Sequence, residues 1–193
     1  MAGRTDTGVH AFGQVASLDT DGGPPPDRAV EALNALFPED LSVLIAEEAA
    51  PDFHARHSAR ARSYRYRIFR RRTPSPFEAH RAWWYPRPLD REALDESAAL
   101  LVGEHDFRAF TPTETHHRVL SRDVLEAQWV DDGDFLELEI TADSFLRHMV
   151  RTLVGTMIEL PPTHVEKLLA GRQRAEAGTT APARGLYLER VEY

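Results

Sequence analysis

The feature that most constrains the fold is a pair of strand-like segments joined by a short turn. The segments are VLEAQWV (124–130) and FLELEIT (135–141), and both contain the β-branched and aromatic residues that favour strands. The turn between them, DDGD (131–134), holds a glycine among aspartates, which is typical of a hairpin loop. A third segment, SYRYRI (63–68), alternates tyrosine or isoleucine with arginine. We therefore expect antiparallel strands with two different faces.

Further elements are expected along the chain. The expected helices are 28–37 (capped by Asp27 and ended by Pro38), 91–102 (capped by Asp90 and ended by Gly103), 145–160, and a short helix from a Thr163–Glu166 capping box to about Gly171. The other expected strands are 12–19, 41–49 and 186–193. This irregular order of strands and helices favours an α+β fold, in which helices pack on antiparallel sheets.

Composition narrows the class of protein. The chain has 193 residues, 42% of them hydrophobic, which is enough for one large domain or two small ones. It contains no cysteine, which excludes disulfides, thiol nucleophiles and thiolate metal sites. No apolar run approaches the ~20 residues that span a bilayer, and the polar N-terminus does not resemble a signal peptide. We therefore expect a cytoplasmic location.

The cations are almost all arginine. The net charge of −8 argues against a generic basic nucleic-acid binder, yet arginine occurs 22 times and Lys167 is the single lysine. Arginine contacts phosphates through a planar fork and stacks on rings. A GC-rich genome or a salt-adapted host would also produce this bias, so the positions of the arginines are more informative than their number.

One arginine-rich stretch suggests a contact with RNA. Residues 53–72 contain eight arginines and no acid, and four aromatic residues are interleaved with them. Alternation places Tyr64 and Tyr66 on one face of the strand and Arg65 and Arg67 on the other. Because arginines neutralise phosphates and rings stack on bases, we predict Arg65 and Arg67 as substrate contacts. The alternative is a solvated edge strand that charge protects from aggregation.

The loop GRTDTG (3–8) places a carboxylate, Asp6, among turn-forming residues. An Asx-turn, in which the aspartate bonds its own backbone, is the commonest reason for such a residue. An aspartic protease would need a second such loop, from the same chain or a dimer partner, and this chain has no other Asp-Thr-Gly or Asp-Ser-Gly. Attack on a different substrate is the third possibility, and the loop alone does not decide among the three.

Other polar residues carry weaker signals. Arg147 and Arg151 lie four apart on the expected helix 145–160, in a row with Gly155. This row is either a polar helix face or an arginine aimed at a carboxylate, with Gly155 allowing a neighbour to approach closely. His10 and His148 are expected to be hydrogen-bonding core or groove residues.

No metal site is expected. The remaining clustered histidines occur as His54-Ala-Arg-His57 and His116-His117, without the HExxH spacing or the nearby acids of common metal sites.

Five segments, in order along the chain, together resemble the TruA family of tRNA pseudouridine synthases. They are GRTDTGVHAFGQV, FHARHSARARSYRYRI, EHDFRAF, SFLRHMVRTLVG and TTAPARGLYL. The resemblance extends from residue 3 to residue 193. It implies the α+β pseudouridine synthase fold, with two similar halves whose antiparallel or mixed sheets join at a central cleft. It also implies conversion of uridine to pseudouridine at positions 38–40 of the tRNA anticodon stem-loop, which needs no cofactor because nothing is oxidised or reduced.

The resemblance implies roles for individual residues. Asp6 would be the catalytic aspartate, and Arg151 of the Met-Val-Arg helix would pair with it. Tyr64 would lie against the target uracil, and Leu186 would pack beside that base. Arg4 would help to turn the nucleotide out of its stack.

The resemblance also implies how the chain is organised. Residues 1–60 would be the N-terminal half, and residues 61–193 the C-terminal half. Family members usually carry several dozen residues ahead of the GRTD loop, so we expect the first strand and helix of the N-terminal half to be missing. A homodimer whose joined clefts hold tRNA is expected. The alternatives are an inactive RNA-binding protein of the same fold and, more distantly, an aspartic hydrolase.

Overall fold

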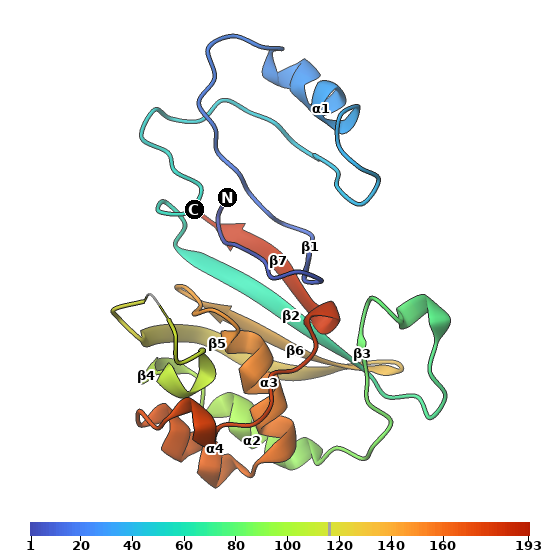
Figure 1. Cartoon of the computed structure of the whole chain (residues 1–193), viewed down its shortest axis with the longest axis vertical. Coiled ribbons are helices and arrows are strands. Elements are labelled where there is room, and N and C mark those ends of the chain that lie inside the picture. Colours follow the sequence, from blue (N-terminus) through green and yellow to red (C-terminus); the bar gives the residue numbers. More distant parts are fainter. Residues whose placement is uncertain (116) are drawn as a thin grey trace.

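The computed structural model describes residues 1–115 and 117–193, and within them a mixed β-sheet carries helices on one face (Figure 1). Seven strands of this described part form the sheet, in the order β1-β7-β2-β6-β5-β4, and β3 pairs with β2. The strands are β1 (His10–Ala11), β2 (Ala61–Phe69), β3 (Trp83–Trp84), β4 (Gly103–Asp106), β5 (Ser121–Asp132), β6 (Phe135–Ala142) and β7 (Leu186–Glu192). The helices are α1 (Pro26–Asn34), α2 (Arg91–Ala99), α3 (Met149–Glu159) and α4 (Pro162–Leu169).

The central hairpin is the one that the sequence predicts. β5 and β6 pair antiparallel, and Gly133 in the turn between them has φ of 58°, which glycine adopts without strain. β2 pairs antiparallel with β6 on one side and with β7 on the other. The short pairs β1–β7 and β2–β3 are parallel. The predicted α+β class with a mixed sheet is therefore confirmed, whereas the division into two similar halves stays a prediction.

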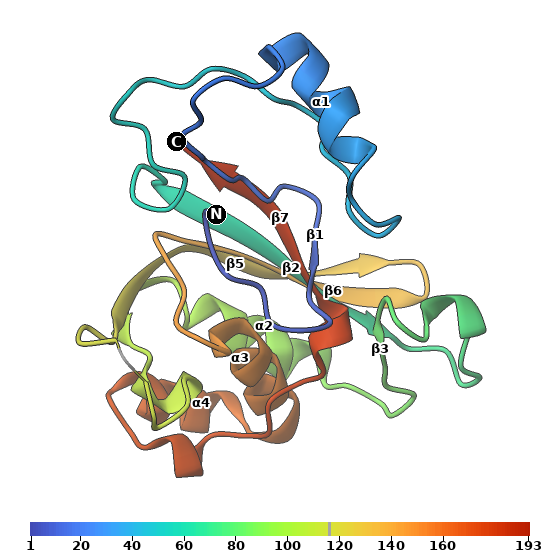
Figure 2. The same cartoon turned by 45° about the horizontal axis from the view of Figure 1, so that its top comes forward.

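The alternation along β2 gives the sheet its two faces. Tyr66 and Ile68 are fully buried in the core that the sheet shares with the helices. Figures 1 and 2 show α2, α3 and α4 together on that side of the sheet. The core contributed by the helices and the neighbouring strands includes Leu94, Leu101, Leu136, Leu138, Ile140, Leu153, Val154 and Leu168. Each such side chain contributes about 1.5–3 kcal/mol on burial, and this apolar contact holds the helices on the sheet.

Local capping signals predict α2 well. Asp90 caps it as expected, because its side chain accepts a hydrogen bond from the backbone N–H of Ala93 at 3.1 Å. The helix ends at Ala99, three residues earlier than predicted, and the chain then turns at Gly103, which has φ of 104°.

Two other predicted helix starts are wrong. The helix expected from residue 145 begins only at Met149, because His148 has φ of 62° and this left-handed conformation interrupts the helical backbone. The capping box predicted at Thr163 is absent, because α4 already begins at Pro162 and Thr163 lies inside it.

Residues 18–53, here called the arm, extend beyond the β7 side of the sheet and away from α2–α4 (Figures 1 and 2). The arm contains α1, which is predicted, but Asp27 is not its cap, and none of its residues is buried. The strands predicted at 12–19 and 41–49 are wrong. A strand needs a partner to bond its backbone N–H and C=O groups, and these two segments form no ladder with the described residues.

Candidate active site

Asp6 begins a tight turn in the N-terminal loop. The N–H of Val9 donates to the carbonyl of Asp6 at 3.0 Å, and Gly8 has φ of 82°. A positive φ at the third residue is what a type II turn requires, and glycine supplies it. The loop then passes into β1, which lies beside β7. The turn expected from the sequence is therefore present, but the carboxylate does not bond its own backbone.

The Asp6 carboxylate is instead held by an arginine of α3. Nη1 of Arg151 donates to Oδ2 of Asp6 at 2.9 Å. The side chain of Arg151 is 15% exposed and that of Asp6 is 33% exposed. The ion pair is thus partly shielded from water, while the carboxylate stays accessible from outside. An arginine aimed at a carboxylate is what the Arg147–Arg151–Gly155 row suggested.

Arg151 is fixed in turn by the segment ahead of β7. Its Nε donates to the carbonyl of Ala181 at 2.8 Å, and its own carbonyl accepts from the N–H of Ala181 at 3.0 Å. These bonds need the segment to lie against α3. Gly155 allows this, because a Cβ at position 155 would lie 1.9 Å from the carbonyl oxygen of Thr179. The close approach predicted at Gly155 is confirmed.

A second nitrogen group, the imidazole of His148, lies near the same carboxylate oxygen. Its Nε2 lies 3.3 Å from Oδ2 of Asp6. Burial is the largest cause that lowers the pKa of His148, and the Asp6 carboxylate opposes this shift. The sequence predicts His148 only as a core or groove residue. No spacing rule predicts the contact with Asp6, because His148 precedes α3 with a left-handed backbone and does not lie on the helical face.

Tyr64 lies beneath the N-terminal loop on the helix-facing side of β2. Its ring packs edge-on against Phe145 with 5.0 Å between centroids, and a Cβ on Gly3 would lie 3.9 Å from its hydroxyl. Burial is the main cause that raises the pKa of Tyr64, and the nearby Asp6 carboxylate raises it further, while Arg62 opposes both. The structure therefore brings Tyr64 into the same neighbourhood as Asp6.

Leu186 occupies the neighbouring strand, β7, where it pairs in register with Tyr66. Its place depends on Gly185, because a Cβ there would lie 2.7 Å from the Tyr66 ring. The Tyr66 hydroxyl also donates to the carbonyl of Pro182 at 2.8 Å, just ahead of Leu186. Tyr66 thus positions the segment that leads into β7.

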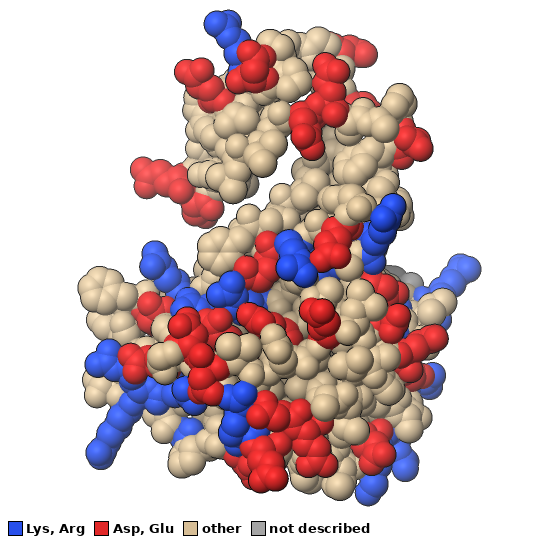
Figure 3. Space-filling view, turned by 180° about the vertical axis from the view of Figure 1, so that it is seen from behind, with Lys and Arg blue, Asp and Glu red and all other residues tan. Residues whose placement is uncertain are grey.

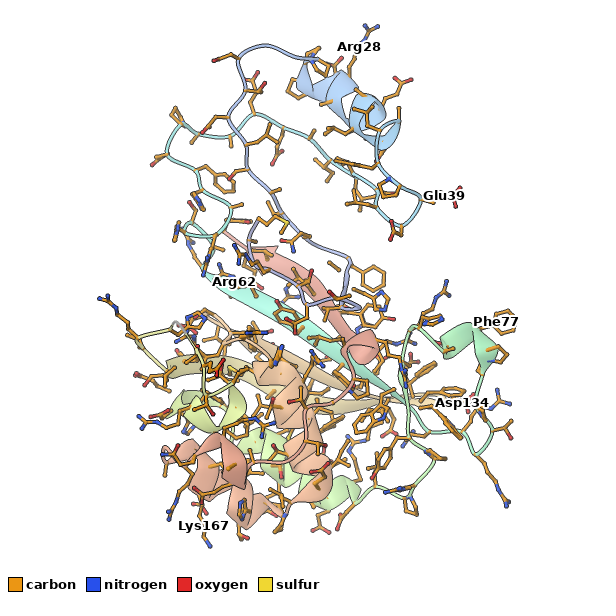
Figure 4. The ribbon with its side chains drawn as sticks, in the orientation of Figure 1. Arg28, Glu39, Arg62, Phe77, Asp134 and Lys167 are labelled. Carbon is orange, nitrogen blue, oxygen red and sulfur yellow. The ribbon has the colours of Figure 1, made fainter. Side chains whose placement is uncertain are left out.

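Arg62 connects the N-terminal loop to the rest of the site. Figure 4 shows Arg62 at the start of β2, between the arm and the sheet. Its guanidinium donates to four backbone carbonyls, of Ala2, Arg56, Ala59 and Asp143. These bonds hold the start of the loop that carries Asp6 against the strand that carries Tyr64.

Comparison with known proteins identifies the family. A family model described as tRNA pseudouridine synthase matches residues 97–193. A protein of Moorella thermoacetica named tRNA pseudouridine synthase A is 47% identical, and the alignment covers all of this chain and 80% of that protein. Proteins of the same name from Thermus thermophilus and Bacillus subtilis are 46% and 40% identical, with all of this chain and 79% and 80% of each relative covered.

The chain belongs to the tRNA pseudouridine synthase family. The resemblance recognised in the five sequence segments is thereby confirmed. The family model matches the part of the chain that contains β5, β6, α3 and β7, and thus Arg151 and Leu186. The relatives extend the match to the whole chain, and so to Asp6 and Tyr64.

Three of the residues predicted to contact the substrate lie outside the group formed by Asp6, Arg151 and Tyr64. Arg4 is exposed, two residues before Asp6, and makes no hydrogen bond or ion pair with any other described residue. Arg65 and Arg67 point to the sheet face opposite Tyr64. There both contact Glu137, at 3.3 Å and 2.7 Å, and the Glu137 side chain is only 4% exposed.

The charges on the surface of this family member are mixed. Figure 3 shows acidic and basic side chains interspersed over the body of the molecule, whereas the arm shows acidic groups and little basic charge. Within the arm nine residues are acidic and Arg28 is the single cation. The arm therefore offers a single cation for contact with phosphates.

Neither metal ligands nor a membrane span stands out in the described part of this chain. Residues 1–115 and 117–193 contain no group of three or more acidic, histidine or cysteine side chains that could hold a metal ion. His54 and His57 pack against each other with 4.4 Å between ring centroids, while His116 lies outside the described residues. None of the described helices has the length and apolar character needed to cross a bilayer.

Proposed function

We propose that the protein isomerises uridine to pseudouridine in tRNA, with Asp6 as its catalytic carboxylate. The observation that carries this proposal is the ion pair between Asp6 and Arg151, 145 residues apart in the chain, beside the ring of Tyr64. Family membership supports the same reaction, because the relatives are named tRNA pseudouridine synthases. The alternative of an inactive RNA-binding protein gains no support, since this pair is intact.

The reaction breaks the N1–C1′ glycosidic bond, rotates the uracil and rejoins it to C1′ through C5. Positive character develops at C1′ as the bond breaks, and a nearby carboxylate stabilises it electrostatically or covalently. The proton on C5 leaves and N1 gains one, so the isomerisation balances without an oxidant or a cofactor. The guanidinium of Arg151 holds this carboxylate by an ion pair at 2.9 Å.

The target base has to leave its stack, which costs a few kcal/mol. Stacking on the Tyr64 ring, worth about 1–3 kcal/mol per base, offsets part of this cost. Burial and the Asp6 carboxylate raise the pKa of Tyr64, which favours its protonated hydroxyl beside the stacking surface of the ring. We assign Leu186 to the side of the base and the exposed Arg4 to the extruded nucleotide.

The finer assignments are also proposals. Uridines at positions 38–40 of the anticodon stem-loop are the proposed targets, and a cytoplasmic homodimer is the proposed form of the enzyme. The proposed N-terminal half, residues 1–60, supplies Asp6, and the C-terminal half, residues 61–193, supplies Tyr64 and Arg151. An aspartic hydrolase is disfavoured, because the two groups next to the Asp6 carboxylate are an arginine and a histidine and neither is a second carboxylate.

Carbodiimide mapping of pseudouridine in tRNA incubated with the protein tests the proposal. We expect modification by the wild type and none by Asp6→Asn, which removes the negative charge and keeps the shape. Asp106→Asn is the matched control, because Asp106 also pairs with an arginine, Arg108, but at the β4 edge of the sheet. Equal modification by Asp6→Asn and wild type refutes the role of Asp6, and an inactive wild type refutes the function.

A further inference from the structure

Two nitrogen atoms, one from Arg151 in α3 and one from His148 just before it, lie close to a single oxygen of Asp6. Nη1 of Arg151 lies 2.9 Å and Nε2 of His148 lies 3.3 Å from Oδ2. The other carboxylate oxygen, Oδ1, makes no hydrogen bond or ion pair with the described residues. The carboxylate is therefore fixed on one side and open on the other.

The backbone of His148 aims its ring at Asp6. His148 is the one non-glycine residue with positive φ in the described part of the chain, a conformation that is uncommon for side-chain-bearing residues. It occupies the N-cap position of α3, yet its side chain makes no capping bond to the helix. A polar N-cap side chain ordinarily accepts from the first turn. Here that bond is given up, and the ring contacts the Asp6 carboxylate instead.

The surroundings of His148 favour its neutral form. Burial lowers the pKa of the imidazole, and three guanidinium groups, of Arg151, Arg147 and Arg174, act in the same direction. The Asp6 carboxylate opposes them. A neutral imidazole carries one proton, and only the tautomer protonated on Nε2 can donate toward the Asp6 carboxylate. That tautomer supplies a donor without adding a second positive charge beside Asp6.

We propose that His148 is a positioning residue, whose Nε2–H acts with Arg151 to hold Oδ2 of Asp6 and to present Oδ1 to the nucleotide. This inference rests on the proposed function. One donor leaves the carboxylate free to swing about its Cβ–Cγ bond, whereas two donors on one oxygen restrict its plane. A neutral second donor restricts the carboxylate while lowering its nucleophilicity less than a second cation would.

Two substitutions distinguish the effect of the side-chain donor from the effect of the backbone conformation at position 148. His148→Gln keeps an N–H donor at the ε position, and His148→Gly removes the side chain while tolerating positive φ. Misplacing a reacting group by about 1 Å can cost about 100-fold in rate. We expect the single-turnover rate of pseudouridine formation to fall about 10–100-fold in His148→Gly and to return to within about threefold of wild type in His148→Gln. The dissociation constant for tRNA should change less than about threefold in both, since the effect lies on the chemical step.

Each other outcome overturns the proposal. An unchanged rate in His148→Gly shows that the contact between His148 and Asp6 does not contribute to the reaction. A His148→Gln rate as low as that of His148→Gly shows that the ring, not its donor, is needed. A loss confined to tRNA affinity shows that His148 binds RNA instead.

A measurement that does not depend on enzyme activity tests this inference separately from the proposed function. The ¹⁵N shifts of the His148 ring in the free protein report its tautomer. We expect protonation at Nε2 in the wild type and a changed pattern in Asp6→Asn, even if the wild type modifies no tRNA. Protonation at Nδ1 alone in the wild type overturns the inference, whatever the activity.

Discussion

At the scale of single residues, the site depends on the two acceptors to which the guanidinium of Arg151 donates hydrogen bonds. Arg151 uses Nε for the carbonyl of Ala181 and Nη1 for the Asp6 carboxylate, so one side chain joins the α3 helix to two other segments. A lysine carries the same charge on one compact ammonium group and cannot span both acceptors with fixed geometry.

We predict that Arg151→Lys lowers the single-turnover rate of modification about 100-fold and weakens tRNA binding less than about threefold. Lysine keeps the positive charge next to Asp6, but it loses the fixed geometry of the guanidinium donors. Arg147→Lys is the matched control, since Arg147 is exposed on the same part of the chain. Equal losses in both variants, or a loss in affinity alone, would contradict a role for Arg151 in orienting Asp6.

The lowered pKa of His148 predicts how stability varies with pH. In the unfolded chain the imidazole titrates near ~6.5, and in the folded protein it titrates lower. Between these two values the unfolded state binds more protons, so the free energy of unfolding rises as pH increases through the window. Well above both values the imidazole is neutral in both states and the effect is constant.

We therefore predict that the melting temperature of the wild type relative to His148→Gln decreases as pH is lowered from 7.5 to 5.5. Because both proteins share all other titratable groups, most of their contributions to the pH dependence cancel in this comparison. The charged groups that face the ring are Asp6, Arg147, Arg151 and Arg174. Thermal melts followed by circular dichroism measure the difference. A difference that stays flat, or that grows toward low pH, would show that the folded protein does not disfavour the charged ring.

At the scale of elements, α3 and the segment before β7 approach closely enough to exclude a methyl group. Gly155→Ala normally favours a helix by about 1 kcal/mol, but here the new Cβ would overlap the carbonyl of Thr179. We predict a net loss of about 1–3 kcal/mol in the free energy of unfolding, as for overpacked cores. Activity should fall as well, because the displaced segment carries the Ala181 carbonyl that fixes Arg151.

Denaturant unfolding of Gly155→Ala, beside Gly133→Ala in the hairpin turn, checks this prediction. A Cβ at Gly133 meets nothing within 4 Å, so any loss there comes from its positive φ alone and leaves the site in place. Full activity in Gly155→Ala would show that Arg151 does not depend on this approach.

The second face of the sheet tests the predicted role of the arginine-rich strand. Arg67 contacts Glu137 at 2.7 Å, and its guanidinium lies 4.1 Å from the Phe135 ring centroid. Removing it leaves the buried Glu137 with Arg65 alone. We predict that Arg67→Met lowers the free energy of unfolding by about 2–3 kcal/mol, less than for a fully broken buried pair. Arg71→Met, in an exposed pair with Asp134 at 3.8 Å, should cost less than about 1 kcal/mol.

The salt dependence of tRNA binding decides between the two roles of Arg67. A structural role leaves the slope of log K against log salt unchanged in Arg67→Met. The phosphate contact predicted from the sequence would reduce that slope by about one. Filter binding at several salt concentrations distinguishes these outcomes.

What the sequence predicts well is local. The alternation of β2, the Asp90 cap and the hairpin turn are each encoded within a few neighbouring residues. The positive φ of His148 has no such signal, because non-glycine residues adopt it rarely. The contact between Asp6 and Arg151 joins residues 145 positions apart, so spacing could not predict it, and only the resemblance to a family did.

At the scale of the whole molecule, the arm and the body differ in charge and in burial. The arm has nine acids, one arginine and six exposed large apolar side chains, which are Leu18, Leu36, Phe37, Leu41, Leu44 and Ile45. Acidic groups repel phosphates, and exposed apolar groups favour contact with protein. The arm therefore attracts phosphates weakly and exposes apolar surface.

This division gives the proposed homodimer a specific test. Leu44 and Ile45 are 75% and 77% exposed, so replacing both by serine removes little buried surface and should leave the melting temperature nearly unchanged. If copies associate through the arm, sedimentation velocity should show the wild type shifting to a larger species as concentration rises, and Leu44→Ser/Ile45→Ser should weaken that association at least tenfold. Leu125→Ser is the matched control, because Leu125 is also exposed, at 48%, but lies on β5 of the body. The same sedimentation profile in the arm double variant and in the wild type would place the contact between copies elsewhere, and a wild type that stays monomeric at every concentration would exclude the homodimer.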